Sequence, residues 1–205
     1  MHKLANEHRV LIKCILCYLC GLLNKGLLLY HDSPLTLHGF FDFLHAFSDV
    51  DWVGNKDDYS STSAYLVYLG CNLVSWSSKK QPLLLACPQK QNTVFVATTD
   101  VELYWVYSLL LELGIGLPNS IVVYCDNVGA TQLSFNPIFY SRMKHVVVDY
   151  HCIRDQVQSD LLRVAHVSSI DQLANILIKS LPTSQFLLFQ DKIGISTRDA
   201  SWGNI

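Results

Sequence analysis

The chain has 205 residues, of which 50% are hydrophobic and only 16% are charged, and glycine and proline are scarce. This composition excludes a disordered, collagen-like or low-complexity protein and is typical of a fold of one or one and a half domains. The formal net charge of -2 excludes a global basic field, so a nucleic-acid partner would have to be held by a local patch.

The first apolar segment has the spacing of an amphipathic helix. Leucines and isoleucines recur at helical spacing over residues 6–23, and Gly26 follows where the helix should end. The wider apolar stretch 10–30 leaves a membrane-anchored protein as an alternative. Its uninterrupted part, residues 14–23, is shorter than the roughly 20 residues that cross a bilayer, so we expect no stable membrane association.

The cysteines bear on the compartment and on one possible metal site. Seven cysteines, an odd number, with no secretory leader before them, favour a reducing intracellular compartment, cytoplasmic or nuclear, over secretion. Cys14, Cys17 and Cys20 have a spacing that suggests metal ligands. Three positions on one helix rarely close a tetrahedral site without a fourth ligand, so this is the weaker interpretation.

The middle of the chain predicts strands followed by one long helix. Segment 35–53 is apolar and rich in β-forming residues, and the similar pieces LHGF and LHAF within it suggest a local insertion around 40–47. Residues 64–69 and 73–77 predict a hairpin. A long helix is expected over 93–113.

The second half alternates strands with helices. Residues 121–125 are fully apolar, as in a buried parallel strand. The elements expected after it are two helices (129–135 and 147–157), a strand (161–167) and a helix capped by Ser168 or Ser169 that runs to Lys179. Pro182 should end the compact part. The order predicts a mixed α/β domain on one sheet.

Three aspartates occupy positions typical of functional sites. Asp49 lies in the first strand of the domain, Asp126 ends an interior strand, and Asp171 lies in the first turn of the last helix. Carboxylates without histidine or cysteine partners are hard ligands for Mg²⁺ or Mn²⁺, and two such ions about 4 Å apart suit phosphodiester hydrolysis. Turn and cap roles are the alternative, and spacing alone does not separate the two.

Long motifs across the chain resemble the reverse-transcriptase-linked ribonuclease H domain of copia-type retrotransposons. They are FSDVDWVGNKDDYSSTSAYLVYLGCNLVSWSSKKQ (47–81), ELGIGLP (112–118), VVYCDNVGATQLSFNPIFYSRMKHVVVDYHCIRDQVQS (122–159) and HVSSIDQLANILIKSLP (166–182). Upstream, residues 7–29 resemble the helix that ends the reverse transcriptase. The chain therefore resembles the C-terminal fragment of a plant-type Pol polyprotein.

This resemblance implies an α/β fold and an organisation into three parts. The fold expected is a ribonuclease H-like mixed sheet flanked by helices. We expect a remnant reverse-transcriptase C-terminal helix region at 1–34, the ribonuclease H-like domain at 35–180 and a C-terminal tail at 181–205. The partners implied are an RNA:DNA hybrid and the reverse-transcriptase domain of a Pol polyprotein.

The same resemblance assigns catalytic roles. Asp49, Asp126 and Asp171 match three of the four acidic ligands that bind two Mg²⁺ or Mn²⁺ ions in the family, whose activity is endonucleolytic hydrolysis of the RNA strand of a hybrid. The fourth ligand is a glutamate in the family, and here Asn92 occupies its place. We therefore expect the second ion to bind weakly and the activity to be impaired.

Neighbouring residues do not restore the lost charge. Asp100 and Glu102 follow Asn92 on the same expected helix, about 12–15 Å further along its axis, which is too far to replace it. Asn175 stands where the family usually has aspartate. Two rival functions remain: a non-catalytic relic of the same fold that binds nucleic acid weakly or not at all, and a membrane-associated protein anchored by residues 10–30.

Several polar residues flank the expected cleft and are candidates for contacts with nucleic acid. They are Asn127, Lys79, Lys80, Arg142 and Lys144. Asn127 could reach a ribose 2′-hydroxyl, or it could cap the next helix. For the basic residues, a solvated loop is the alternative.

Overall fold

The computed structural model describes residues 6–29, 44–55, 60–81, 88–117, 119–135 and 147–197. Its elements in chain order are α1 (Asn6–Leu22), β1 (Lys25–Leu27), β2 (Leu44–Asn55), β3 (Ser60–Leu69), β4 (Asn72–Gln81), α2 (Pro88–Glu112), β5 (Ile121–Cys125), α3 (Val128–Phe135), α4 (Val147–Gln158), β6 (Leu162–His166), the 3₁₀ helix η2 (Leu173–Leu177), α5 (Thr183–Ile193) and β7 (Ile195–Thr197). The part of the expected insertion before residue 44, and also Arg142 and Lys144, lie outside the described residues.

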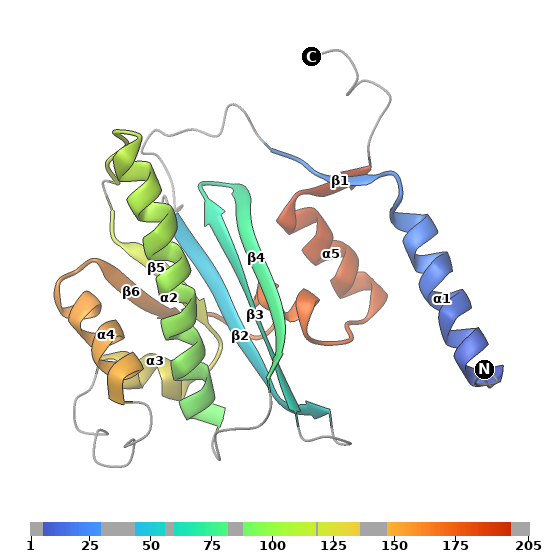
Figure 1. Ribbon diagram of the computed structural model, residues 1–205, viewed down its shortest axis with the longest axis horizontal. Helices are drawn as coiled ribbons and strands as arrows, with labels where there is room; N and C mark the ends of the chain where they lie inside the picture. The colour runs from blue at the N-terminus through green and yellow to red at the C-terminus, as the bar shows by residue number, and fades with distance from the viewer. Residues whose placement is uncertain are drawn as a thin grey trace, which may run out of the picture.

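A five-stranded mixed sheet in the order β4-β3-β2-β5-β6 forms the centre of the molecule (Figure 1). β3 is antiparallel to both β2 and β4, whereas β5 is parallel to both β2 and β6. The buried apolar run of β5 explains its interior position, because a strand covered on both faces needs apolar residues throughout. The sequence predicted this strand and its parallel pairing.

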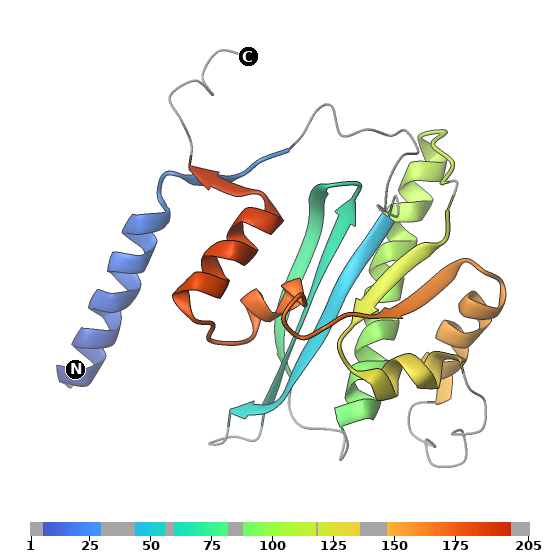
Figure 2. The ribbon, with the colours of Figure 1, turned by 180° about the vertical axis from the view of Figure 1, so that it is seen from behind.

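Side chains of β2 alternate between two apolar clusters, one on each face of the sheet. Ala46 and Val50 join the larger cluster with residues of α2 and α4, including Leu103 and Ile153. Phe47, of opposite parity, packs against the second cluster with residues of η2 and α5. Figure 2 shows η2 and α5 on the sheet face opposite α2.

The chain beyond Pro182 belongs to the folded structure, so the prediction that the compact part ends there is wrong. α5 buries Phe189 completely against the sheet, and β7 pairs antiparallel with β1 at the other end of the chain. The reason is the apolar face of α5, which completes the second cluster. The boundaries of the three expected parts stay a prediction.

The last predicted helix is also different from the expectation. Ser168 and Ser169 precede a turn in which the Asp171 amide donates to the Ser168 carbonyl, and regular structure resumes only as the short helix η2. The side chain of Gln172, not a serine, caps it. Where the structure describes them, the other predicted helices and strands are confirmed, with β3, β4 and α2 longer than expected; the part of segment 35–53 before Leu44 lies outside the described residues.

The first helix, α1, forms as predicted but leaves most of its apolar side chains exposed. These include Leu11, Ile15 and Leu16, each more than half exposed. In the described part of the chain, the helix long and apolar enough to cross a membrane is α2, over Gln91–Glu112, and not α1. α2 packs on the sheet through buried residues such as Leu103, as a core helix does.

Candidate functional site

Asp126 directly follows the carboxyl end of β5, and Asp49 lies beside it in the middle of β2, at the point where the parallel pairing of β2 with β5 stops. The register pairs Ser48 of β2 with Cys125 of β5, and each aspartate directly follows its member of this pair. Parallel strands are about 4.8 Å apart, so the two carboxylates share one edge of the sheet. The side chain of Asp49 is almost fully buried, whereas Asp126 is half-buried.

Both oxygens of the Asp49 carboxylate have partners. Oδ2 accepts a hydrogen bond from the Lys179 ammonium at 2.7 Å, and Oδ1 accepts one from the Val50 amide, also at 2.7 Å. Val50 packs under α2, so Asp49 projects to the opposite face of the sheet, where Lys179 follows η2. The lysine therefore supplies the positive charge nearest to this carboxylate among the described residues.

The environment of Asp49 opposes its ionisation despite the lysine. The pKa of Asp49 is raised to about 6. Burial raises this pKa most, the hydrogen bond from Lys179 lowers it, and the negative charge of Asp126 raises it. Removal of the carboxylate from water and a like charge nearby both favour the protonated form. A cation is needed here to keep the pair ionised.

Segment 168–179 is fastened to this edge of the sheet by side-chain hydrogen bonds. Ser169 Oγ donates to Asp126 Oδ2 at 3.0 Å, and Gln172 Nε2 donates to the Ser48 carbonyl at 3.0 Å. Within the segment, Asn175 Nδ2 donates to the Ser169 carbonyl at 3.0 Å. These bonds fix the part of the chain from which Lys179 reaches Asp49.

Asp171 is not drawn into the pair. It is exposed, and its Oδ1 accepts from Lys192 of α5 at 3.2 Å. The turn that starts at Ser168 directs Ser169, rather than Asp171, to Asp126. The structure thus brings together two of the three predicted aspartates, and their roles as ligands stay a prediction.

Asn92 lies on α2 and is 5% exposed. α2 begins at the end of the sheet where β2 and β5 have their carboxyl ends (Figures 1 and 2). The acidic residues that follow Asn92 on α2, Asp100 and Glu102, have other partners, as expected. Asp100 accepts a hydrogen bond from Gln156 of α4 at 2.7 Å, and burial together with the nearby charge of Glu102 raises the pKa of the Tyr65 hydroxyl.

Asn127 has the structural role that was one of its two predicted alternatives. Its Oδ1 accepts a hydrogen bond from the Ala130 amide at 3.0 Å, which caps the start of α3. Lys79 and Lys80 are exposed at the end of β4, and the register places Lys79 opposite Ser63, which in turn is opposite Val50. These two lysines therefore lie two strands away from the Asp49 position.

The described residues do not form the two-metal centre that the resemblance implies. Among them, no group of three or more histidine, cysteine, aspartate or glutamate side chains could hold a metal ion. Asp171 pairs with Lys192, Asn92 carries no charge, and Lys179 is bound to Asp49. The same finding excludes a metal site formed by Cys14, Cys17 and Cys20, which are exposed thiols on α1.

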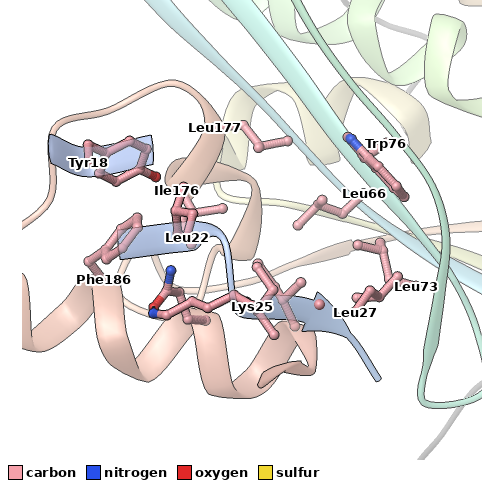
Figure 3. Close-up of a pocket in the computed structure, with 14 residues that line it drawn as sticks. Tyr18, Leu22, Lys25, Leu27, Leu66, Leu73, Trp76, Ile176, Leu177 and Phe186 are labelled. Carbon is pink, nitrogen blue, oxygen red and sulfur yellow. The ribbon is translucent and has the colours of Figure 1, made fainter. Parts of the chain in front are cut away.

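An apolar pocket of about 390 Å³ lies on the same sheet face but has no acidic lining (Figure 3). Leu66 and Trp76 line it from the sheet, and Tyr18 and Leu27 line it from the N-terminal elements. Trp76 is 57% exposed at its rim. The pocket is therefore separate from the aspartates in chemistry.

Lys179 and Ser169 are the residues of this site that the sequence analysis missed. Both lie in the motif HVSSIDQLANILIKSLP, in which Asp171 was the residue predicted to bind a metal ion. Only the fold brings residue 179 to residue 49.

Sequence relatives of the chain are polyproteins. It is 50% identical over 196 residues to the Retrovirus-related Pol polyprotein from transposon RE1 of Arabidopsis thaliana, covering 96% of this chain and 13% of that protein. The chain is 47% identical to the polyprotein from transposon RE2 of the same plant, and the match covers 100% of this chain and 14% of that protein. It is 31% identical to the polyprotein from transposon TNT 1-94 of Nicotiana tabacum, and the match covers 92% of this chain and 14% of that protein. No family model matches the chain.

Solved structures align at a distance. The N-terminal RNase H domain of a Mycobacterium tuberculosis protein has a TM-score of 0.45 at 10% identity and covers 72% of this chain and 96% of its own. LC11-RNase H1 in complex with RNA/DNA hybrid has a TM-score of 0.44 at 11% identity, and the alignment covers 66% of this chain and 93% of LC11-RNase H1. The family of the chain follows from its sequence relatives instead.

The antiparallel strands β4-β3-β2, continued by the parallel strands β5 and β6, form the ribonuclease H-like mixed sheet that the resemblance implies. The chain belongs to the copia-type retrotransposon Pol polyproteins, of which it is one segment. It spans 13–14% of the length of these relatives.

Proposed function

We propose that this segment is a ribonuclease H-like domain that binds RNA:DNA hybrids and hydrolyses the RNA strand far more slowly than its family. The observation that carries the proposal is the Asp49–Asp126 pair on the adjacent strands β2 and β5, where their parallel pairing stops, in a chain homologous to Pol polyproteins. The uncharged Asn92, in the place of the family glutamate, accounts for the impairment. Hydrolysis in the family depends on divalent ions, and the chain as described offers an incomplete ligand set.

Exposed lysines on β4, two strands away from Asp49, support binding of a polyanion. Lys79 and Lys80 are exposed at the end of β4, which is the edge strand on the opposite side of β2 from β5. Cationic side chains near a scissile phosphate supply much of the affinity for nucleic acid. With a net charge of -2 for the whole chain, this affinity depends on the local lysines and falls with salt.

The setting of the domain is part of the same proposal. We expect it to act beside the reverse-transcriptase segment of its polyprotein, in a reducing compartment inside the cell. The exposed apolar residues of α1, such as Leu11 and Ile15, are suited to packing against such a segment.

Cleavage of a labelled RNA:DNA hybrid with Mg²⁺ or Mn²⁺ tests the proposal. We expect slow cleavage by the wild-type chain, at least about tenfold faster cleavage by Asn92→Glu, and none by Asp126→Asn. Gln91→Glu adds the same charge one residue away and is the matched control, for which no gain is expected. Equal rates for the wild-type chain and Asn92→Glu would contradict the proposal.

The second candidate is the non-catalytic relic, and the Lys179–Asp49 ion pair favours it, because it occupies the carboxylate that the family uses. Hybrid binding by Lys79→Gln/Lys80→Gln, compared with the wild-type chain, separates the two. No cleavage by any variant, together with equal and weak binding by both chains, would establish the relic and overturn the proposed activity.

A further inference from the structure

Each oxygen of the Asp49 carboxylate already has a hydrogen-bond partner within the chain itself. Its Oδ2 bonds to Lys179 at 2.7 Å and its Oδ1 to the Val50 amide at 2.7 Å. Its side chain is 3% exposed, so water contributes little to its solvation. A divalent ion that bound to Oδ2 would have to displace the ammonium group.

The charge of the pair explains why a cation belongs here. Asp49 and Asp126 repel each other on neighbouring strands, and burial adds a cost to the charge on Asp49. A cation at the shared edge relieves both effects. Within the described part of the chain, Lys179 is the charged partner of this pair, since Asp126 accepts only from the neutral Ser169.

Lys179 is held in place by its backbone, whereas its side chain is free to exchange. Its amide donates to the Asn175 carbonyl at 2.9 Å, and η2 is fastened to β2 through Gln172 and Ser48. The Lys179 side chain is 36% exposed, so the ammonium can turn into water without unfolding η2. The ion pair is therefore displaceable.

We propose that Lys179 is the resident cation of the Asp49–Asp126 pair and competes with divalent metal ions for Asp49. Lys179 is a positioning residue that sets the metal affinity of the site. The inference rests on the proposed function only in its choice of Mg²⁺ and Mn²⁺ as the competing ions. The weak metal binding expected of this chain is therefore attributed to Lys179 together with Asn92.

Mn²⁺ titration of the chain without nucleic acid, followed by electron paramagnetic resonance of the free ion, tests this inference. Lys179→Gln should bind Mn²⁺ at least about tenfold more tightly than the wild-type chain, because the competing cation occupies the carboxylate most of the time. Adding Asp126→Asn to this variant should abolish the gain. Lys192→Gln removes the lysine of the other described lysine–aspartate pair and should leave Mn²⁺ affinity unchanged.

Loss of folding is separated from loss of competition by the melting temperature. Lys179→Gln leaves a buried carboxylate without its counter-charge and should melt at a lower temperature in metal-free buffer. Mn²⁺ should restore its melting temperature, and do so more than for the wild-type chain, because a ligand of the folded state stabilises it. A structural role alone would lower the melting temperature without this rescue.

Three results would overturn the inference: unchanged Mn²⁺ affinity in a folded Lys179→Gln variant, an equal gain in Lys192→Gln, or no rescue by Mn²⁺. Failure of Asn92→Glu to raise the cleavage rate would sink the proposed function instead. Because the Mn²⁺ titration contains no RNA and measures no cleavage, the two failures are distinguishable.

Discussion

Two lysine–aspartate pairs fasten the C-terminal part of the chain, and they differ chiefly in burial. In the Lys179–Asp49 pair the two groups are 2.7 Å apart and the aspartate is 3% exposed. In the Lys192–Asp171 pair they are 3.2 Å apart and the aspartate is 58% exposed. The same chemistry therefore neutralises a carboxylate at the sheet edge in one case and forms a solvated surface contact in the other.

The difference shows why the predicted aspartates cannot be treated as equivalent. A buried carboxylate requires a counter-charge or a proton, and its removal leaves an uncompensated group. An exposed pair gains little, because water solvates each ion separately. Asp49 is thus a site at which charge must be balanced, whereas Asp171 has solvent as an alternative partner.

The largest effect is expected from removal of the buried cation. Lys179→Met should lower the free energy of unfolding by about 2–3 kcal/mol, less than for a fully buried pair because one third of the lysine is exposed. Urea denaturation at neutral pH measures this loss. A change under about 0.5 kcal/mol would mean that the two pairs are energetically alike.

Asp100 sharpens the comparison, since it is a buried carboxylate with a neutral partner. It is 2% exposed, accepts from Gln156 and, among the described residues, has no hydrogen-bond partner at Oδ1. Burial raises its pKa to about 6. Asp100→Asn should therefore stabilise the chain at pH 8, by about 2 kcal/mol.

The sign of this effect follows from proton linkage. Well below pH 4 the carboxyl is protonated in both the folded and the unfolded state, so Asp100 carries no penalty there. As the pH rises from about 4 to 6, the unfolded chain releases its proton first, and the folded state loses stability. The advantage of Asp100→Asn should therefore grow over this range, and an advantage that is constant with pH would contradict the account.

The smallest effect is expected at the exposed pair. Lys192→Gln should change the free energy of unfolding by about 0.5 kcal/mol or less, because both side chains are well solvated. Raising the salt concentration should remove most of that difference. A loss as large as that of Lys179→Met would show that α5 depends on this contact.

The sequence predicted the sheet because the pattern of its strands is strong. The apolar run of β5 and the hairpin of β3 and β4 fixed the interior and edge of the sheet, and both are confirmed. The segment after β6 was predicted less well. Serines at 168 and 169 are typical helix caps, but here one of them donates to Asp126, and a 3₁₀ helix begins later.

Half of the candidate site was visible in the sequence and half was not. Asp49 and Asp126 were predicted from their places in the first strand and at the end of an interior strand, which are local features. The ion pair joins residues 130 positions apart, and a lysine near the end of a helix normally indicates a solvated side chain. Its role depends on tertiary structure and on burial of its partner, which no local pattern encodes.

A pair of double-mutant cycles tests the central claim most directly. Free energies of unfolding for Asp49→Asn, Lys179→Gln and their combination give one coupling energy, and Asp171→Asn with Lys192→Gln gives the other. The account predicts a coupling of at least about 1.5 kcal/mol for the buried pair and under about 0.5 kcal/mol for the exposed pair. Equal coupling energies would contradict it, because burial of Asp49 would then add nothing to its interaction with Lys179.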